Sequence, residues 1–282
     1  MQLTNPLIAL AVSYCNSHRL ASATTDAVLS LARQWRSESI TQRTIDAHIE
    51  RRRAQLKASS FNREMVSFKA VINHAIKVGK LPGDIKVDAT PEKAVKNGVL
   101  FLSKADIAKI RQAELPDHLQ AERDRFLLQC ATGLRASDIA RLKAEQLHGG
   151  VLTLRLQKTE ELVTIPLTET TQELFCKVVA SGYARNNQRV PAIREICKLA
   201  GINEPWTSTS RVNGQLVDKV GERWQFVGTH TARRSFICNL LAQGVGIEVI
   251  MSMTGHQSYE SIKAYIGIAD DTKSRALALL DD

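Results

Sequence analysis

Residues 131–142 read ATGLRASDIARL, and they place Arg135 directly after a glycine and a leucine. Further along the chain, residues 230–233 read HTAR and supply a second arginine, Arg233. An arginine side chain offers two parallel N–H donors to a phosphate and keeps its charge at any physiological pH. Two such side chains in separate motifs predict a site that clamps a phosphate group.

A third motif supplies a tyrosine, because residues 255–265 read GHQSYESIKAY and place His256 and Tyr265 nine positions apart. Phosphoryl transfer leaves a protein mainly two tasks, which are to position the reacting atoms and to stabilise charge on the non-bridging oxygens. A tyrosine hydroxyl, with a pKa of about 10, is a weak nucleophile until a neighbour accepts its proton and the phosphate is held in line. The order of histidine, arginine, histidine and tyrosine therefore predicts a tyrosine that attacks a phosphodiester.

The three motifs follow each other in the order and at the separations found in the tyrosine recombinases, the phage integrase family, which the chain resembles over about residues 100–268. The pattern Thr-Gly-Leu-Arg-x-Ser-Asp-Ile-x-x-Leu at residues 132–142 is its most specific part. Two positions depart from the commonest family pattern: Arg234 stands where many members have histidine, and Thr254 where leucine is frequent. Tyr259 follows the second histidine too closely to match the family, so we interpret it as a packing or surface residue.

The resemblance implies a role for each residue that matches a motif. Arg135 and Arg233 would be the pair that clamps the phosphate, and His230 would donate a hydrogen bond and handle a proton beside them. His256 would be a further hydrogen-bond donor to the phosphate. Tyr265 would be the nucleophile, forming a 3′-phosphotyrosyl bond and releasing a 5′-hydroxyl.

The family also places a lysine on a β-hairpin after the first arginine motif, as general acid to the leaving oxygen. Residues 151–156 alternate like a strand and residues 162–166 read as its partner, so that Lys158 would lie in the turn region between them. Lys143 is another cation nearby. Asp138 stands where the family has an acidic residue that supports the first arginine, three positions on and hence on the same side of a helix.

The basic charge is concentrated in the first third of the chain. The chain carries 38 Lys and Arg against 29 Asp and Glu, a net charge of +9. Residues 1–98 hold 15 of the basic and 8 of the acidic residues, a balance of +7 that leaves +2 for the remainder. Such an uneven excess favours a polyanion, and the motifs call for DNA. The candidate DNA contacts are Arg51, Arg52, Arg53, Arg63 and Lys77, although the run Arg51 to Arg53 is also typical of a solvated face.

A chain of 282 residues suits about two domains. The sequence predicts a helical core-type DNA-binding domain at residues 1–82, a linker with proline, glycine and lysine at residues 83–98, and a catalytic domain with a C-terminal tail at residues 99–282. The resemblance implies that the two domains form a clamp around a duplex. The expected fold class is mainly α with a small β-sheet (α+β).

Periodicity and capping signals predict the helices. An apolar residue recurs every three or four positions from Phe61 to Ile76, and Ser103-x-x-Asp106 resembles a capping box. Thr229 is predicted to cap the helix that carries the second arginine motif. Residues 206–227 show no clear pattern. The other helices are expected at about 24–35, 41–56, 117–131, 136–144, 168–181, 190–200, 246–252 and 258–266.

We expect neither a metal nor a cofactor. Five cysteines, an odd number without a Cys-x-x-Cys pair, indicate neither a disulfide framework nor a zinc site. His230 and His256 with Asp138 form an alternative metal site, but the family chemistry needs none and no His-x-x-x-His motif supports it. No apolar run approaches 18 residues and no leader precedes one, so we expect no membrane and a soluble, cytoplasmic, nucleoid-associated protein of a bacterium or phage.

The function that follows is site-specific DNA recombination through a 3′-phosphotyrosyl intermediate. Two double-stranded DNA duplexes each need two protomers, so the expected assembly is a homotetramer on synapsed DNA, with accessory DNA-bending proteins as further partners. Residues 272–280 are expected to form a helix that docks on a neighbour or on its own subunit. The alternatives are a type IB topoisomerase-like nicking-closing enzyme and a non-catalytic DNA-binding accessory protein.

Overall fold

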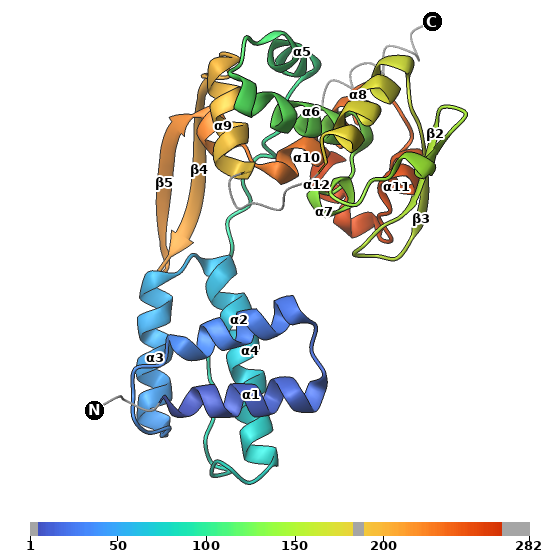
Figure 1. Cartoon of the computed structure of the whole chain (residues 1–282). Helices are drawn as coiled ribbons and strands as arrows, with labels where there is room; N and C mark the ends of the chain where they lie inside the picture. The colour runs from blue at the N-terminus through green and yellow to red at the C-terminus, as the bar shows by residue number, and fades with distance from the viewer. Residues whose placement is uncertain (1–4, 183–188, 267–282) are drawn as a thin grey trace, which may run out of the picture. The chain divides into compact units, whose positions relative to one another are not determined.

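The computed structural model describes residues 5–182 and 189–266 and divides the chain into two compact units (Figure 1). Unit 1 consists of Met1–Asn97 with Thr207–Lys219, and unit 2 consists of Gly98–Trp206 with Val220–Asp282. The described elements are mainly helices with two small sheets, which confirms the predicted fold class. Within the described ranges, no helix is long and apolar enough to cross a membrane.

The described part of unit 1 is built on α1 (Pro6–His18), α2 (Ser22–Arg33), α3 (Gln42–Gln55) and α4 (Ala58–Lys77). Helix α1, which we did not predict, begins with signals that the sequence contains. Asn5 accepts the backbone N–H of Leu7, and a proline occupies the first turn. Helix α3 begins at a reciprocal capping box between Thr41 and Thr44.

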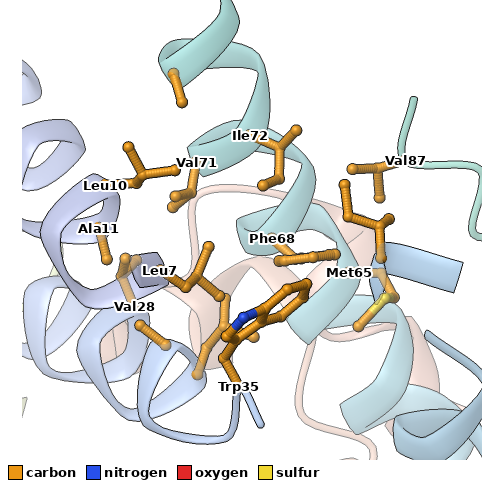
Figure 2. Close-up of a cluster of buried hydrophobic side chains, with 14 of the residues drawn as sticks. Leu7, Leu10, Ala11, Val28, Trp35, Met65, Phe68, Val71, Ile72 and Val87 are labelled. Carbon is orange, nitrogen blue, oxygen red and sulfur yellow. The ribbon is translucent and has the colours of Figure 1, made fainter. Parts of the chain in front are cut away.

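The core of unit 1 forms around α4 (Figure 2). Phe61, Met65, Phe68 and Ile72 are each at most 4% exposed, which confirms the helical periodicity expected for this segment. They pack in one cluster with apolar residues of α1 and α2 and with Trp35. Burying each side chain of this size stabilises the fold by about 1.5–3 kcal/mol. The opposite side of α4 stays in solvent and carries Arg63, Val66, Asn73 and Lys77.

Residues 83–97 pack against unit 1 instead of bridging freely to unit 2. Ile85 and Val87 are buried in the core around α4, because this extended segment turns two apolar side chains inward. The stretch that the sequence predicts as a linker is therefore attached to the N-terminal helices over most of its length.

Three side-chain amides fasten this region: two grip its backbone, and the third belongs to the region itself and grips the backbone of Thr209. In each of these amide clamps, the side-chain NH₂ donates to a backbone carbonyl while the side-chain oxygen accepts the N–H of the same residue. The six hydrogen bonds measure between 2.7 and 3.0 Å. The amide clamps join Gln42 to Lys86, Asn62 to Glu92, and Asn97 to Thr209.

Unit 2 centres on α6 (Asp117–Thr132), which is buried on two sides. Phe126 and Leu127 belong to a cluster with α9 (Arg189–Leu199), and Leu128 belongs to a second cluster with the three-stranded sheet. Further helices and turns surround it: α5 (Lys104–Gln112), α7 (Ala136–Ile139), η1 (Ala144–Gln146), α8 (Glu169–Ala180), η2 (Arg223–Phe226), α10 (Thr229–Leu241), α11 (Ile247–Thr254), η3 (Tyr259–Ser261) and α12 (Lys263–Ile266). The Ser103–Asp106 capping box at the start of α5 is present as predicted.

The three-stranded antiparallel sheet follows the order β1 (Leu147–His148), β2 (Val151–Arg155), β3 (Leu162–Pro166). Leu152 faces Ile165 and Leu154 faces Val163, and all four are buried while their neighbours point to solvent. The alternation seen in the sequence therefore corresponds to one packed face of a hairpin, as predicted.

Residues 206–227, which the sequence left unassigned, contain most of a second hairpin. Strands β4 (Pro205–Val212) and β5 (Gln215–Glu222) are joined by Asn213 and Gly214, both with positive φ (49° and 74°). Asn-Gly with this geometry is the preferred two-residue turn of a hairpin, because its twist matches that of the strands.

Several predicted helix limits differ from the structure. Helix α2 begins and ends two residues earlier than expected, and α11 ends two residues later. Helix α7 ends at Ile139 instead of continuing to 144, because the N–H groups of Arg141 and Leu142 bond three residues back and tighten the chain. Helix α10 has Gly228 as its N-cap, and Thr231 accepts the glycine N–H, so Thr229 lies inside the helix. In place of one helix over 258–266, η3 and α12 are separate. The helix expected at 272–280 lies outside the described residues.

Candidate active site

Arg135 is held at the start of α7 by a tight turn. Gly133 ends α6 with a φ of 68°, and a Cβ there would lie 2.5 Å from the ring of Phe236, so glycine is required for both conformation and space. Leu134 is fully buried and anchors the turn. Among the described residues, the Nη1 atom of Arg135 is buried and has no hydrogen-bond partner. This donor is available for a ligand oxygen.

Arg233 projects from α10 into the protein and is 1% exposed. Its Nη1 donates to the carbonyl of Gly133 (2.9 Å), and its Nη2 donates to the carbonyl of Thr254 (2.7 Å). One guanidinium thus joins the turn before Arg135 to the end of α11. Burial and the nearby Arg135 lower the pKa of Arg233 to about 10, which indicates that two cations share this space.

His256 follows the end of α11 and contacts the same guanidinium. Its Nδ1 lies 2.7 Å from the Thr254 hydroxyl oxygen, and its Nε2 lies 3.1 Å from Arg233 Nη2. Gly255 has a φ of 63°, and a Cβ at this position would lie 2.2 Å from Leu156, next to the hairpin turn. Burial, Arg233, Arg135 and His230 lower the pKa of His256 to about 4. The imidazole is therefore neutral near pH 7 in the free protein.

His230 lies on the first turn of α10, where its residue surface is largely accessible to solvent. Partial desolvation of the ring lowers its pKa, and the charges of Arg234, Arg233, Arg135 and Lys158 act in the same direction. These interactions bring His230 into the same electrostatic neighbourhood as both arginines and the hairpin lysine. A neutral imidazole here is suited to accept a proton.

Lys158 lies in the turn between β2 and β3, where the sequence placed it, and its side chain is exposed. The turn is tied to α7 because the N–H of Gln157 donates to Asp138 Oδ1 (2.9 Å). We expected Asp138 to support Arg135. Its hydrogen bond in the described structure goes instead to the hairpin, and its Oδ2 is buried without a partner among the described residues. Asp138 therefore positions the hairpin that carries Lys158.

Tyr265 lies on α12 and is 8% exposed, packed in a cluster with Phe236, Ile237 and Ile262. Its phenol is close enough to Arg233 for their charges to interact, since Tyr265 raises the pKa of that arginine. The rival hydroxyl, Tyr259, is 53% exposed and stands on the surface. The described residues thus gather the two arginines, the two histidines and the tyrosine of the three motifs in one part of unit 2, together with Lys158 of the hairpin turn.

The arginine run (Arg51–Arg53) of α3 is committed largely to the fold of unit 1. Arg52 is 9% exposed and donates from Nε and Nη2 to both oxygens of Glu64, which makes it a bidentate ion pair. Arg53 pairs with Glu92 (3.4 Å) and Glu50 (3.7 Å). Arg51 donates to His48 Nδ1 (2.9 Å) and to a backbone carbonyl. The predicted DNA contact by Arg52 is not compatible with this burial.

Arg63 and Lys77 lie on the exposed side of α4. Lys77 lines a hollow of about 590 Å³ between α1 and α4, together with His18, Asn73 and His74. The His18 and His74 rings are 5.3 Å apart, and desolvation, His18, Lys80 and Lys77 lower the pKa of His74. This surface has the basic and polar character that a phosphate backbone would require.

Within the described part of the chain, no cluster of three or more His, Cys, Asp or Glu side chains is arranged to hold a metal ion.

Comparison with known proteins finds similar sequences over the part of the chain that holds the motifs. The model of the phage integrase family matches residues 100–271. Integrase from Escherichia phage P2 is 24% identical over 246 residues, which cover 85% of this chain and 65% of that protein. Tyrosine recombinase XerC of Thermodesulfovibrio yellowstonii is 24% identical over 180 residues, which cover 58% of this chain and 56% of that protein. The chain thus spans less than two thirds of the length of either relative.

A solved structure provides the comparison of folds. A lambda integrase tetramer bound to a Holliday junction superposes with a TM-score of 0.68 at 15% identity, covering 91% of this chain and 76% of that chain. At this identity the likeness shows the fold alone.

Proposed function

Because the chain belongs to the phage integrase family, we propose that it is a site-specific DNA recombinase that cleaves and rejoins DNA strands through a 3′-phosphotyrosyl intermediate. The observation that carries this proposal is the surplus of positive charge around Arg135. A buried Nη1 without a partner in the described structure lies in the same neighbourhood as Arg233, His230, His256 and Lys158. A phosphodiester brings the negative charge and acceptor oxygens that this arrangement lacks.

In the proposed reaction, Arg135 and Arg233 bind the non-bridging oxygens of the scissile phosphate. Arg233 donates to two carbonyls and its Nη2 also faces His256, but Nη1 carries a second N–H group that remains for the phosphate. Because its position is fixed by Gly133 and Thr254, this arginine needs no rearrangement when charge develops on the phosphorus oxygens.

The covalent step makes one bond and breaks one. The oxygen of Tyr265 attacks phosphorus and its proton passes to neutral His230, while the bond from phosphorus to the 5′-oxygen breaks. Lys158 protonates the departing 5′-oxygen, which leaves as a hydroxyl. The phosphotyrosyl bond conserves the energy of the original linkage. A 5′-hydroxyl from a partner strand can then attack it and restore the DNA, without ATP.

The exposed side of α4 is the surface that we propose for duplex DNA in unit 1. Arg63 lies toward its beginning and Lys77 at its end, with Val66 (73% exposed) and Asn73 between them. Basic residues suit backbone phosphates, and the amide and apolar side chains between them suit base edges. Arg51 and Arg53 remain weaker candidates because their donors are used within the protein.

Strand exchange between two duplexes requires four protomers, so we propose a homotetramer on synapsed DNA. The lambda integrase structure with the same fold is a tetramer on a Holliday junction, which supports this assembly. Accessory DNA-bending proteins are the proposed further partners, and the bacterial cytoplasm, where nucleoid DNA is accessible, is the proposed location. The net charge of +9 is consistent with that partner.

The test is covalent capture. The full chain is incubated with a pool of nicked duplexes of random sequence, and DNA that stays attached to protein in detergent is recovered and sequenced. We expect wild-type protein to form the adduct and Tyr265→Phe, which keeps the ring and its packing, to form none. Absence of a wild-type adduct, or an equal yield from the phenylalanine variant, would contradict the proposal and favour a non-catalytic DNA-binding protein.

A second experiment separates recombination from nicking and closing. Two linear duplexes that carry the captured sequence and differ in length are mixed with the protein. Recombinant products of new length are expected. Relaxation of a supercoiled plasmid without any such products would instead indicate a type IB topoisomerase-like enzyme.

A further inference from the structure

Thr254 touches two groups of the proposed active site at once. It is the last residue of α11, and it is fully buried. Its carbonyl accepts Arg233 Nη2 at 2.7 Å, while its hydroxyl oxygen lies 2.7 Å from His256 Nδ1. Thr254 is not among the site residues predicted from the sequence. The only signal there is that a threonine stands where leucine is frequent in the family.

The hydroxyl has only one hydrogen, and the structure assigns it. Thr254 Oγ1 lies 2.6 Å from the carbonyl oxygen of Ile250, which can only accept. The hydroxyl hydrogen therefore points to Ile250, and the oxygen has lone pairs left for the histidine. A hydrogen bond of 2.7 Å to His256 then requires a proton on Nδ1 of the imidazole.

We propose that Thr254 is a positioning residue that fixes the proton of neutral His256 on Nδ1, so that Nε2 presents a lone pair to Arg233. This inference refines the proposed function, on which its mechanistic meaning rests. Arg233 Nη2 is 3.1 Å from Nε2 and 3.3 Å from Nδ1, so these distances alone do not select a nitrogen. With the proton on Nδ1, Nε2 is the ring nitrogen left to accept from Arg233.

The assignment changes the role that the motifs suggest for His256. A neutral ring with its proton on Nδ1 has no N–H at Nε2 to donate to a phosphate oxygen. Nε2 becomes a donor only in the imidazolium form, and burial with Arg233, Arg135 and His230 opposes that form in the free protein. The negative charge of a bound phosphodiester offsets the charge of those cations and raises the pKa of His256. His256 is therefore switched to a donor by the DNA itself.

The tautomer can be measured on the DNA-free protein. Nitrogen-15 NMR of histidine-labelled full-length chain at pH 8 distinguishes the protonated from the bare ring nitrogen, and His256→Gln identifies the signals. We expect the wild-type signals to show a proton on Nδ1 and none on Nε2. A proton on Nε2 in the wild type overturns the proposal, whatever the outcome of the covalent-capture test. If wild type formed no adduct while the Nδ1 proton was present, the proposed function would fail and this assignment would stand.

Two variants test whether the hydroxyl is the cause. Thr254→Ser keeps the oxygen and should keep the wild-type tautomer. Thr254→Val has almost the same shape but no side-chain oxygen to hold the proton on Nδ1. Arg233 Nη2 lies within 3.3 Å of both ring nitrogens and can donate to either, so a substantial fraction of the molecules should carry the proton on Nε2. An unchanged tautomer in a folded valine variant overturns the proposal. Should the valine variant fail to fold, the wild-type and serine spectra decide the outcome.

A pH profile provides a readout that a purely structural role would not alter. With saturating captured duplex, the adduct rate of wild type and Thr254→Ser should fall as the pH rises through the His256 pKa in the complex. In Thr254→Val the neutral ring can donate from Nε2, so this fall should become shallower, at a lower overall rate. A valine variant with the same fall at the same pH contradicts the proposal.

Discussion

The protein uses arginines in two opposite ways, and the difference lies in the carboxylates around them. The arginine run of unit 1 meets Glu50, Glu64 and Glu92, and its donors are consumed within the fold. The proposed catalytic arginines, Arg135 and Arg233, form no ion pair among the described residues; one has a buried donor without a partner there, and the other bonds to neutral carbonyls. Carbonyls fix a guanidinium without cancelling its charge.

The comparison shows that a run of basic residues says little about availability. In the sequence, three adjacent arginines look like the stronger binding site for a polyanion. In the structure, however, Arg52 is paired with Glu64 inside unit 1. Two isolated arginines look weaker, and they hold the unneutralised charge. What distinguishes them is whether an acidic side chain forms an ion pair with the guanidinium: Asp138 is near enough to raise the pKa of Arg233, but among the described residues it does not pair with either arginine.

The largest expected contrast is in activity. Arg135→Ala should reduce the rate of adduct formation about 100- to 1,000-fold, the usual cost of removing one charged donor from a reacting phosphate or oxyanion. Its free energy of unfolding in urea should be unchanged or slightly higher, because the lost donor has no partner among the described residues and a neighbouring cation is relieved. A large loss of stability would show that this arginine is structural after all.

Arg52→Ala should give the opposite result. Removing one member of a largely buried bidentate pair leaves Glu64 unpaired, so the free energy of unfolding should fall by about 3 kcal/mol, the lower end of the range for a buried pair. The adduct rate per folded molecule should stay at the wild-type value. The double variant Arg52→Met with Glu64→Met should recover most of the stability. If the single variant loses DNA cleavage while remaining stable, the comparison is incorrect.

A smaller effect concerns His48, which lies beside the arginine run. Burial and the charges of Arg51 and Arg52 lower its pKa to about 4. An unfolded histidine, with a pKa of about 6.5, binds a proton more readily, so stability is greatest above pH 6.5 and is lost as the pH falls toward 4. Lowering the pH from 7 to 5 should therefore reduce the free energy of unfolding by about 2 kcal/mol through His48, since one pKa unit corresponds to about 1.4 kcal/mol.

The measurement is urea unfolding at both pH values. His256 titrates in the same direction, so the decisive quantity is the difference between wild type and His48→Gln, which keeps an acceptor for Arg51. An equal loss of stability on acidification in both proteins would show that His48 does not cause this pH dependence.

The smallest effect is on DNA affinity. If Arg63 and Lys77 each contact one phosphate, replacing either by alanine should make the slope of log K against log salt shallower by about 1. The stable Arg52→Met, Glu64→Met protein serves as the matched control, and its slope should equal that of wild type. Binding of the captured duplex is measured over a series of salt concentrations. If the slope changes in the control but not in the α4 variants, the DNA-binding surface lies on α3 instead.

The sequence predicted the elements whose signals are local. The helical repeat from Phe61 to Ile76, the box at Ser103 and the alternation of β2 and β3 depend on residues a few positions apart, and the structure confirms each. The hairpin of β4 and β5 was also recognisable, since Asn213-Gly214 between two runs rich in threonine and valine is a strong turn signal that the weak alternation around it obscured.

Other features depend on contacts between distant residues. Arg52 and Glu64 are twelve positions apart on separate helices, and no periodicity relates them. The bond from Asp138 to Gln157 joins a helix to a hairpin and replaces the expected support of Arg135. Thr254 acts through the direction of one hydroxyl hydrogen, which only the backbone of α11 determines. Residue types identified the site, but the partners within it required the fold.

The amide clamps have one more consequence. They recognise peptide groups, so the grip tolerates any residue except proline, which lacks the backbone N–H. Lys86 is an example: its N–H and carbonyl are bonded to Gln42 while its side chain stays exposed. A cysteine placed there could therefore carry a fluorescent dye at a fixed point of unit 1, and energy transfer to a second dye on unit 2 would report whether DNA changes the distance between the two units.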